Sequence, residues 1–209
     1  MNLDKLRDAE SLFLHRYPGG FANEEMQKIG KRHNVAKLSE YASTALARKR
    51  FDRHAQVLDD IVKIVTRSSM VSMFEKPRFR DWVNGLARND RALLAGGFER
   101  LLHGNRERGF TDLVDLLDEA KLAKWSLMTI CPYQYRPDED VFVKPTTTKN
   151  VIRQFELELE YRPRPSWTFY AAYRDAIAQM KAAVNPSLSP NNAAFTGFLM
   201  MSTAVGTQD

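Results

Sequence analysis

Apolar residues recur at steps of three and four along most of the chain, which is the spacing that places them on one face of an α-helix. The clearest stripe is formed by Phe51, Ala55, Leu58, Ile61, Val62 and Val65. Similar stripes, separated by Pro, Gly or helix-capping residues, predict helices over 3–17, 24–46, 77–86, 90–102, 111–130, 166–180 and 189–199. We therefore expect a mainly α fold, a single multi-helix domain over residues 1–209.

Residues 132–165 break this pattern with five prolines and predict an irregular segment that begins where a helix ends, at Cys131-Pro132. Apolar and acidic residues alternate over 155–161, the period of a half-buried strand. We predict at most a small two-stranded β element near residues 141–161. The acidic run Asp138-Glu139-Asp140 is typical of a solvated turn, because three consecutive acids cannot all face one metal ion.

Length and composition indicate a folded protein of the cytoplasm. A chain of 209 residues with 44% hydrophobic content can bury a sizeable core. Cys131 is the single cysteine, so no disulfide can form within the chain. The N-terminal sequence MNLDKLRDAE lacks the apolar run of a secretory signal, and no apolar stretch approaches the ~20 residues that span a bilayer. We expect a cytoplasmic protein without a membrane partner.

Sequence motifs that hold common cofactors are missing. The chain has no phosphate-cradling P-loop, no dinucleotide-binding glycine pattern and no zinc-binding pair of histidines on one helix. The four histidines, His15, His33, His54 and His103, are far apart in the sequence. We expect no cofactor and no metal site.

Positive charge is concentrated in one part of the chain. Between Lys28 and His54 there are eight lysines and arginines against two acids, whereas the remainder is nearly balanced. Such a patch can bind the phosphates of nucleic acid or an acidic partner protein. The predicted binding residues are Lys28, Lys31, Arg32, Arg48, Lys49, Arg50 and Arg53, and Lys76, Arg78 and Arg80 extend this set. The competing interpretation is a set of solvated helix faces, with Phe79 in the core.

Five residues separate Arg48 from His54, which is similar to the arginine-to-histidine spacing of all-α HEPN ribonucleases. In such a site the histidine moves the proton of a ribose hydroxyl and the arginine stabilises the phosphate in the transition state. A chain rich in arginine yields this spacing by chance, and Lys49 stands where that family carries a small polar residue. A basic helix end is therefore the competing interpretation.

Short strings spread over most of the chain resemble those of a family of uncharacterised bacterial proteins. They are RYPGGF at 16–21, FEKPRFRD at 74–81, KWSLMTICPYQYRPDEDVFVKPTTTK at 124–149, YRPRPSW at 161–167 and SLSPNNAAFTGFL at 187–199. The chain departs from the family at 190–192, where Pro-Asn-Asn replaces an aspartate-rich approach to the last helix. The resemblance implies one continuous domain and assigns no activity and no catalytic residue.

Lys144 and Lys149 lie on either side of a predicted helix start, for which Thr146 or Thr147 would be the cap. Free amides at a helix start bind anions together with nearby ammonium groups. Lys144, Thr146 and Lys149 are therefore a candidate anion site. The competing interpretation is a capped helix with exposed lysines.

These observations together favour a non-enzymatic helical binding module. We expect it to engage nucleic acid, or an acidic protein partner, through the basic patch at 28–54. The first alternative is an all-α HEPN-like ribonuclease that uses Arg48 and His54. The second alternative is a structural subunit of a larger bacterial complex. The sequence leaves the oligomeric state open.

Overall fold

The computed structural model describes residues 1–33 and 35–204, apart from the side chains of residues 31–33, 35 and 204. Within these residues the chain forms eleven α-helices and three short 3-10 helices, and no β-strand. The prediction of a mainly α fold is confirmed. No helix in this part of the chain is long and apolar enough to cross a membrane.

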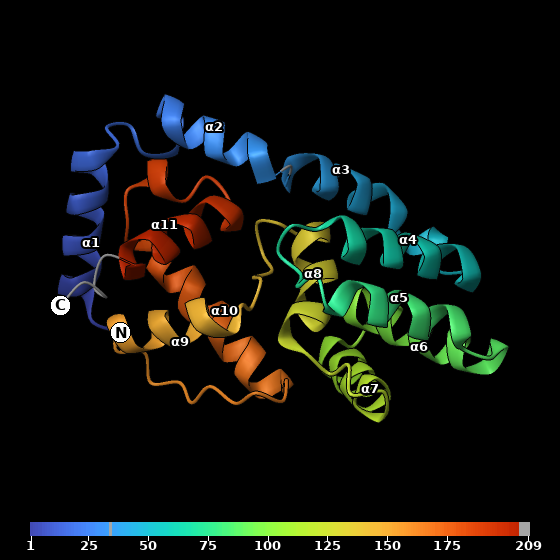
Figure 1. Cartoon of the computed structure of the whole chain (residues 1–209). Coiled ribbons are helices and arrows are strands. Elements are labelled where there is room, and N and C mark those ends of the chain that lie inside the picture. Colours follow the sequence, from blue (N-terminus) through green and yellow to red (C-terminus); the bar gives the residue numbers. More distant parts are fainter. Residues whose placement is uncertain (34, 205–209) are drawn as a thin grey trace.

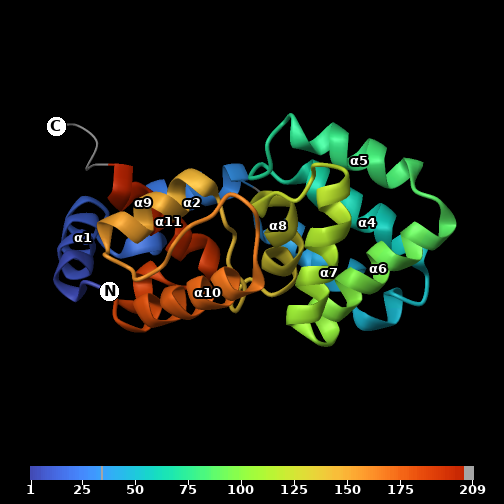
Figure 2. The same cartoon turned by 90° about the horizontal axis from the view of Figure 1, so that it is seen from below.

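The helices form two groups that lie side by side (Figures 1 and 2). The first group contains α1 (Leu3–Arg16), η1 (Gly20–Ala22), α2 (Glu24–His33), α9 (Pro145–Gln154), α10 (Trp167–Ala182), η3 (Pro186–Leu188) and α11 (Asn192–Ala204). The second group contains α3 (Val35–Ala45), η2 (Arg48–Arg50), α4 (His54–Arg67), α5 (Glu75–Gly85), α6 (Arg88–His103), α7 (Arg106–Glu119) and α8 (Trp125–Tyr135). One cluster of buried apolar side chains, from Leu6 to Leu199, extends through both groups.

Helices α6 and α7 pack closely through glycines. A Cβ atom added at Gly109 would stand 2.3 Å from the backbone nitrogen of Leu101, and one added at Gly97 would stand 2.7 Å from a methyl carbon of Leu113. Glycine lowers helix propensity by about 1 kcal/mol relative to alanine. At Gly97 and Gly109 this cost is offset by the close approach of the two helices.

The β element predicted near residues 141–161 is not present in the described structure. Phe155 and Leu157 are buried while Glu156 and Glu158 are exposed, so the alternation does report burial on one side. The segment nevertheless pairs with its own neighbours, since the Leu157 amide donates to the Ile152 carbonyl oxygen at 3.0 Å. A strand needs a second segment for its backbone hydrogen bonds, and the periodicity of one segment cannot supply it.

Helix α8 continues to Tyr135, although the sequence predicted its end at Cys131-Pro132. Proline inside a helix removes one backbone hydrogen bond and costs about 3 kcal/mol. All residues of α8 from Trp125 to Gln134 are buried, so tertiary packing outweighs this cost. Helix α9 lies within the stretch predicted to be irregular, at the place where a helix start was predicted between Lys144 and Lys149, and it begins with Pro145, whose fixed φ suits the first helical position.

Candidate functional site

The basic segment turns a corner between α3 and α4, at the end of the molecule opposite α1 (Figure 1). The short helix η2 is followed by a turn, and α4 begins at His54. Phe51 in this turn is buried, and its ring centroid lies 5.4 Å from that of His103 in an edge-on contact. The Nε2–H of His103 donates to the Leu46 carbonyl oxygen at 2.8 Å, since a carbonyl oxygen only accepts. The buried Phe51 ring and the hydrogen bond from His103 therefore anchor the backbone of this corner to the core.

One cation of this segment, Arg50, is engaged with the fold. Its guanidinium donates to the buried carboxylate of Asp60 at 2.9 Å, and that carboxylate also accepts from the Tyr41 hydroxyl at 2.6 Å and the Lys63 ammonium at 3.4 Å. Burial raises the pKa of Asp60, but the hydrogen bonds from Tyr41, Arg50 and Lys63 outweigh it, so this pKa lies below its ordinary value. Burial and the Asp60 carboxylate raise the pKa of Tyr41 to about 12.

Four basic side chains of the corner face solvent. Arg48, Lys49, Arg53 and His54 are exposed, and none has a hydrogen-bond or ion-pair partner within the described residues. Arg53 and His54 are the N-cap and the first residue of α4, whose first turn has no side-chain cap and no acidic residue, whereas Arg48 and Lys49 lie in the preceding η2. The free amides of that turn form the positive end of the helix dipole. We call these four residues the α4 corner, because they bring exposed cations and the free N–H groups of a helix start to one short segment.

The predicted residues on α2 are separated from the α4 corner. Lys28 is exposed on α2, and the side chains of Lys31 and Arg32 lie outside the described part of the chain. Helices α2 and α3 follow one another along one edge of the molecule (Figure 1). The 11 residues of α3 extend about 16 Å, so Lys28 does not belong to the same cluster as the α4 corner.

The predicted cations of α5 are divided. Arg78 is exposed and has no partner among the described side chains, Lys76 is half-buried, and Arg80 donates to Asp81 at 2.8 Å. Residues two positions apart on a helix do not face each other, so Arg78 and Arg80 do not form one patch. Phe79 is completely buried and belongs to the core.

The candidate anion site at α9 is only partly assembled. Lys144 is the N-cap of α9, and it is exposed together with Thr146 in the first turn. Neither predicted threonine caps the helix. The ammonium of Lys149 lies over the ring of Tyr161, 5.8 Å from its centroid. This contact engages Lys149, and an anion site at Lys144 and Thr146 stays a prediction.

Arg48 and His54 belong to two different elements, η2 and α4, and both are exposed. A catalytic histidine needs a third group that orients its ring. His54 has no hydrogen-bond partner among the described side chains. The HEPN-like pair therefore stays a prediction, and within the described residues no protein group holds the imidazole.

The described residues contain no group of three His, Cys, Asp or Glu side chains that could hold a metal ion. Cys131 is completely buried on α8, and burial raises the pKa of its thiol to about 12. The thiol is therefore protonated at neutral pH and out of contact with solvent, which makes it a core residue and not a nucleophile.

Asp140 is completely buried, which corrects the prediction that the whole acidic run forms a solvated turn. Its two neighbours on the N-terminal side are exposed, as the sequence predicted. The Asp140 carboxylate accepts hydrogen bonds from Arg106 on α7 and from Nε of Arg136 after α8 at 2.8 Å. It also forms an ion pair with Arg174 on α10, whose Nε lies 3.0 Å from the carboxylate and donates to the Glu139 carbonyl oxygen at 3.4 Å.

The Asp140 carboxylate joins the two groups of helices. Arg106 and Arg136 approach it from the second group, and Arg174 and Tyr170 from the first, with the Tyr170 hydroxyl donating at 3.2 Å. Burial and the nearby Asp140 raise the pKa of Tyr170 well above its ordinary value. Arg106, Tyr170 and Arg174 are far from Asp140 in the sequence, and Arg136, four residues before it, does not differ from the other arginines of the chain. The sequence analysis therefore did not predict this cluster. Its members bind one another, which makes it a structural joint between the groups.

Comparisons of the chain with protein-family models, with curated proteins and with solved structures found no match. The resemblance to a bacterial family therefore stays a prediction.

Proposed function

We propose that this chain is a nucleic-acid-binding protein that holds phosphate groups at the α4 corner. The observation that carries the proposal is the combination of three unpartnered lysine and arginine side chains with an uncapped helix start, within the described residues. Backbone N–H groups at a helix start donate directly to phosphate oxygens, and the surrounding cations neutralise the phosphate charge. The corner thus offers both kinds of group that a phosphate backbone requires.

The energetics of α4 also favour an anionic ligand. Arg53 occupies the N-cap position and His54 the first helical position. Cations at the positive end of a helix dipole are unfavourable by a few tenths of a kcal/mol to about 1 kcal/mol. An anion seated at the corner would relieve this cost.

The first experiment measures fluorescence anisotropy of labelled single-stranded RNA, single-stranded DNA and duplex DNA, each at two salt concentrations. If the three permanent cations of the corner each neutralise one phosphate, the logarithm of the affinity for a single strand falls with a slope of about −2 against the logarithm of the salt concentration. A fourfold increase in salt should then weaken binding roughly 20-fold.

A charge-reversal variant tests the site, and a control variant with the same change in net charge tests the position. The first variant carries Arg48→Glu, Lys49→Glu and Arg53→Glu. Arg50 stays unchanged, because its loss would leave the buried Asp60 carboxylate without a partner. The control reverses three exposed cations of the first helix group and its adjoining segment, namely Arg7→Glu, Arg153→Glu and Arg162→Glu.

We expect the first variant to lose binding and the control to keep most of it, with unchanged circular dichroism in both. Equal loss in both variants would mean that overall charge alone attracts the ligand, and it would contradict a site at the α4 corner. Absence of binding to any nucleic acid at low salt would contradict the proposal and favour an acidic protein partner or a larger complex.

The same samples separate binding from cleavage. RNA recovered after the measurement should be intact on a denaturing gel. If the RNA is cut, and the His54→Ala variant binds without cutting, the protein is instead a ribonuclease that uses Arg48 and His54.

A further inference from the structure

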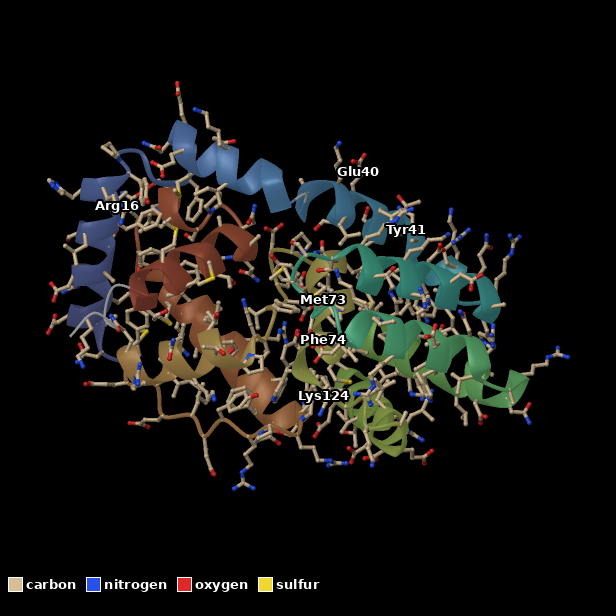
Figure 3. The ribbon with its side chains drawn as sticks, viewed as in Figure 1. Arg16, Glu40, Tyr41, Met73, Phe74 and Lys124 are labelled. Atoms are coloured by element: carbon tan, nitrogen blue, oxygen red, sulfur yellow. The ribbon has the colours of Figure 1, made fainter. Side chains whose placement is uncertain are left out.

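Two neighbouring apolar side chains, Met73 and Phe74, stand out from the surface directly before α5. They are 75% and 77% exposed, the highest values among the large apolar side chains of the described residues. Figure 3 shows both on one face of the molecule, at the start of α5. We call these two residues the apolar tip. Exposing two such side chains costs hydrophobic free energy, which a bound partner would recover.

The backbone under the apolar tip is held by hydrogen bonds. The Ser72 carbonyl oxygen accepts from the amides of Glu75 at 3.0 Å and Lys76 at 3.2 Å, and the Ser72 hydroxyl accepts from the Phe74 amide at 3.3 Å. The Glu75 carboxylate in turn accepts from the Ser126 hydroxyl of α8 at 2.5 Å. The backbone of the tip is therefore held before any ligand arrives, so binding needs to order only the two side chains.

Two cations follow the apolar tip along the chain, and a third is labelled below it in Figure 3. Lys76 and Arg78 follow it on α5, and Lys124, the N-cap of α8, lies on the same face (Figure 3). The acidic residue of this segment, Glu75, is engaged with Ser126. An occupant that fits this surface carries negative charge and also presents a flat apolar face. An unpaired nucleotide has both, a phosphate and a base whose face can stack on an aromatic ring.

The apolar tip and the α4 corner lie at opposite ends of one pair of helices. Helices α4 and α5 run side by side in opposite directions (Figure 1), so the start of α5 lies near the end of α4. The 14 residues of α4 extend about 21 Å. A single strand that contacts phosphates at the corner and a base at the tip must therefore run at least the length of α4.

We infer that the apolar tip is a base-stacking element and that the nucleic acid bound by this protein is single-stranded, an inference that rests on the proposed function. In a duplex the faces of the bases are already stacked on one another, so Phe74 would have no base to receive. The ligand class is thus unpaired RNA or DNA, contacted through phosphates at the α4 corner and through a base at Phe74.

The test compares Phe74→Ala with Phe74→Trp and with the matched control Leu12→Ala, which truncates an exposed apolar side chain of α1. The probes are a labelled single strand of about 12 nucleotides and a duplex of the same length. We expect Phe74→Ala to weaken single-strand binding about 5- to 150-fold, Phe74→Trp to retain it, and Leu12→Ala to leave it unchanged. Duplex binding should be weaker than single-strand binding and insensitive to Phe74.

The outcomes separate this inference from the proposed function. If the corner reversal abolishes binding and Phe74→Ala does not change it, the base contact is wrong and the proposed function stands. If the wild-type protein binds no nucleic acid, the proposed function fails and this inference fails with it. Binding of wild-type protein, but not of Phe74→Ala, to phosphatidylserine vesicles without any affinity for nucleic acid would identify the tip as a membrane contact and overturn the inference.

Discussion

Replacement of Asp140 by asparagine should destabilise the whole molecule. Asp140→Asn preserves the shape of the side chain but removes its charge, and it places an amide group against three guanidinium groups. In the native protein the Asp140 carboxylate accepts hydrogen bonds from Arg106 and from Arg136 at 2.8 Å, and it forms an ion pair with Arg174 at 3.0 Å. The substitution therefore leaves three cations facing one another at the junction of the two helix groups.

Removal of one partner from a buried ion pair costs about 3–5 kcal/mol. The side chains of Arg106, Arg136 and Arg174 are 22%, 20% and 18% exposed, so water relieves part of this cost. We therefore expect the lower end, about 3 kcal/mol less free energy of unfolding. In a chain of this size each kcal/mol lowers Tm by about 2–4 °C, so the melting temperature should fall by roughly 10 °C.

Urea unfolding followed by circular dichroism measures this change. The control is Asp138→Asn, an exposed acid two residues earlier, which should stay within about 0.5 kcal/mol of wild type. If Asp140→Asn does not fold, Tyr170→Phe removes a hydroxyl that the same carboxylate shares with the Val141 carbonyl oxygen, and it should cost about 1 kcal/mol. An Asp140→Asn protein within about 1 kcal/mol of wild type would refute the conclusion that this carboxylate holds the two groups together.

Two further predictions concern stability. Gly109→Ala should destabilise the protein by several kcal/mol, because its Cβ would stand 2.3 Å from the Leu101 backbone nitrogen. Gly96→Ala should be neutral or stabilise by up to about 1 kcal/mol, because its Cβ meets only the end of a flexible side chain. Thermal unfolding compares the two variants, and equal effects would contradict the close packing of α6 and α7. The pKa of Asp60 is lowered in the folded protein, so its contribution is present above the unfolded pKa near 4 and is lost as the pH falls through the folded value. Urea titrations between pH 6 and pH 2 should therefore show a smaller loss of stability on acidification in Asp60→Asn than in wild type, and no such difference in the exposed neighbour Asp59→Asn; parallel curves for all three proteins would contradict the ion-pair assignment.

Most helices could be predicted from the sequence, because helix periodicity is a local property. The stripe from Phe51 to Val65 predicted α4, and the buried Val57, Leu58 and Ile61 form its inner face. Periodicity gave the wrong prediction where the local structure depends on contacts with other segments. Residues 155–161 alternate like a strand but have no second strand beside them, and Pro132 should end α8 but is kept in the helix by packing on all sides.

The candidate site was predictable in part for the same reason. The sequence shows that cations are dense between residues 48 and 54, but it does not show which of them are paired within the fold and which are free. Arg50 is drawn to Asp60, ten residues later, and only its neighbours remain available to a ligand. The exposure of Met73 and Phe74 was equally hidden, because apolar residues beside a helix start are ordinarily core residues.

By itself the sequence determined that this protein is helical, that its positive charge gathers in one segment, and that its apolar stripes supply a core. Only the tertiary structure decided which charged side chains form ion pairs within the fold and which remain free. Asp140 and Asp138 are chemically identical and two residues apart, yet one is buried among three arginines and the other is exposed. Periodicity arises from the geometry of neighbouring residues, whereas burial and pairing depend on segments that meet only when the whole chain has folded.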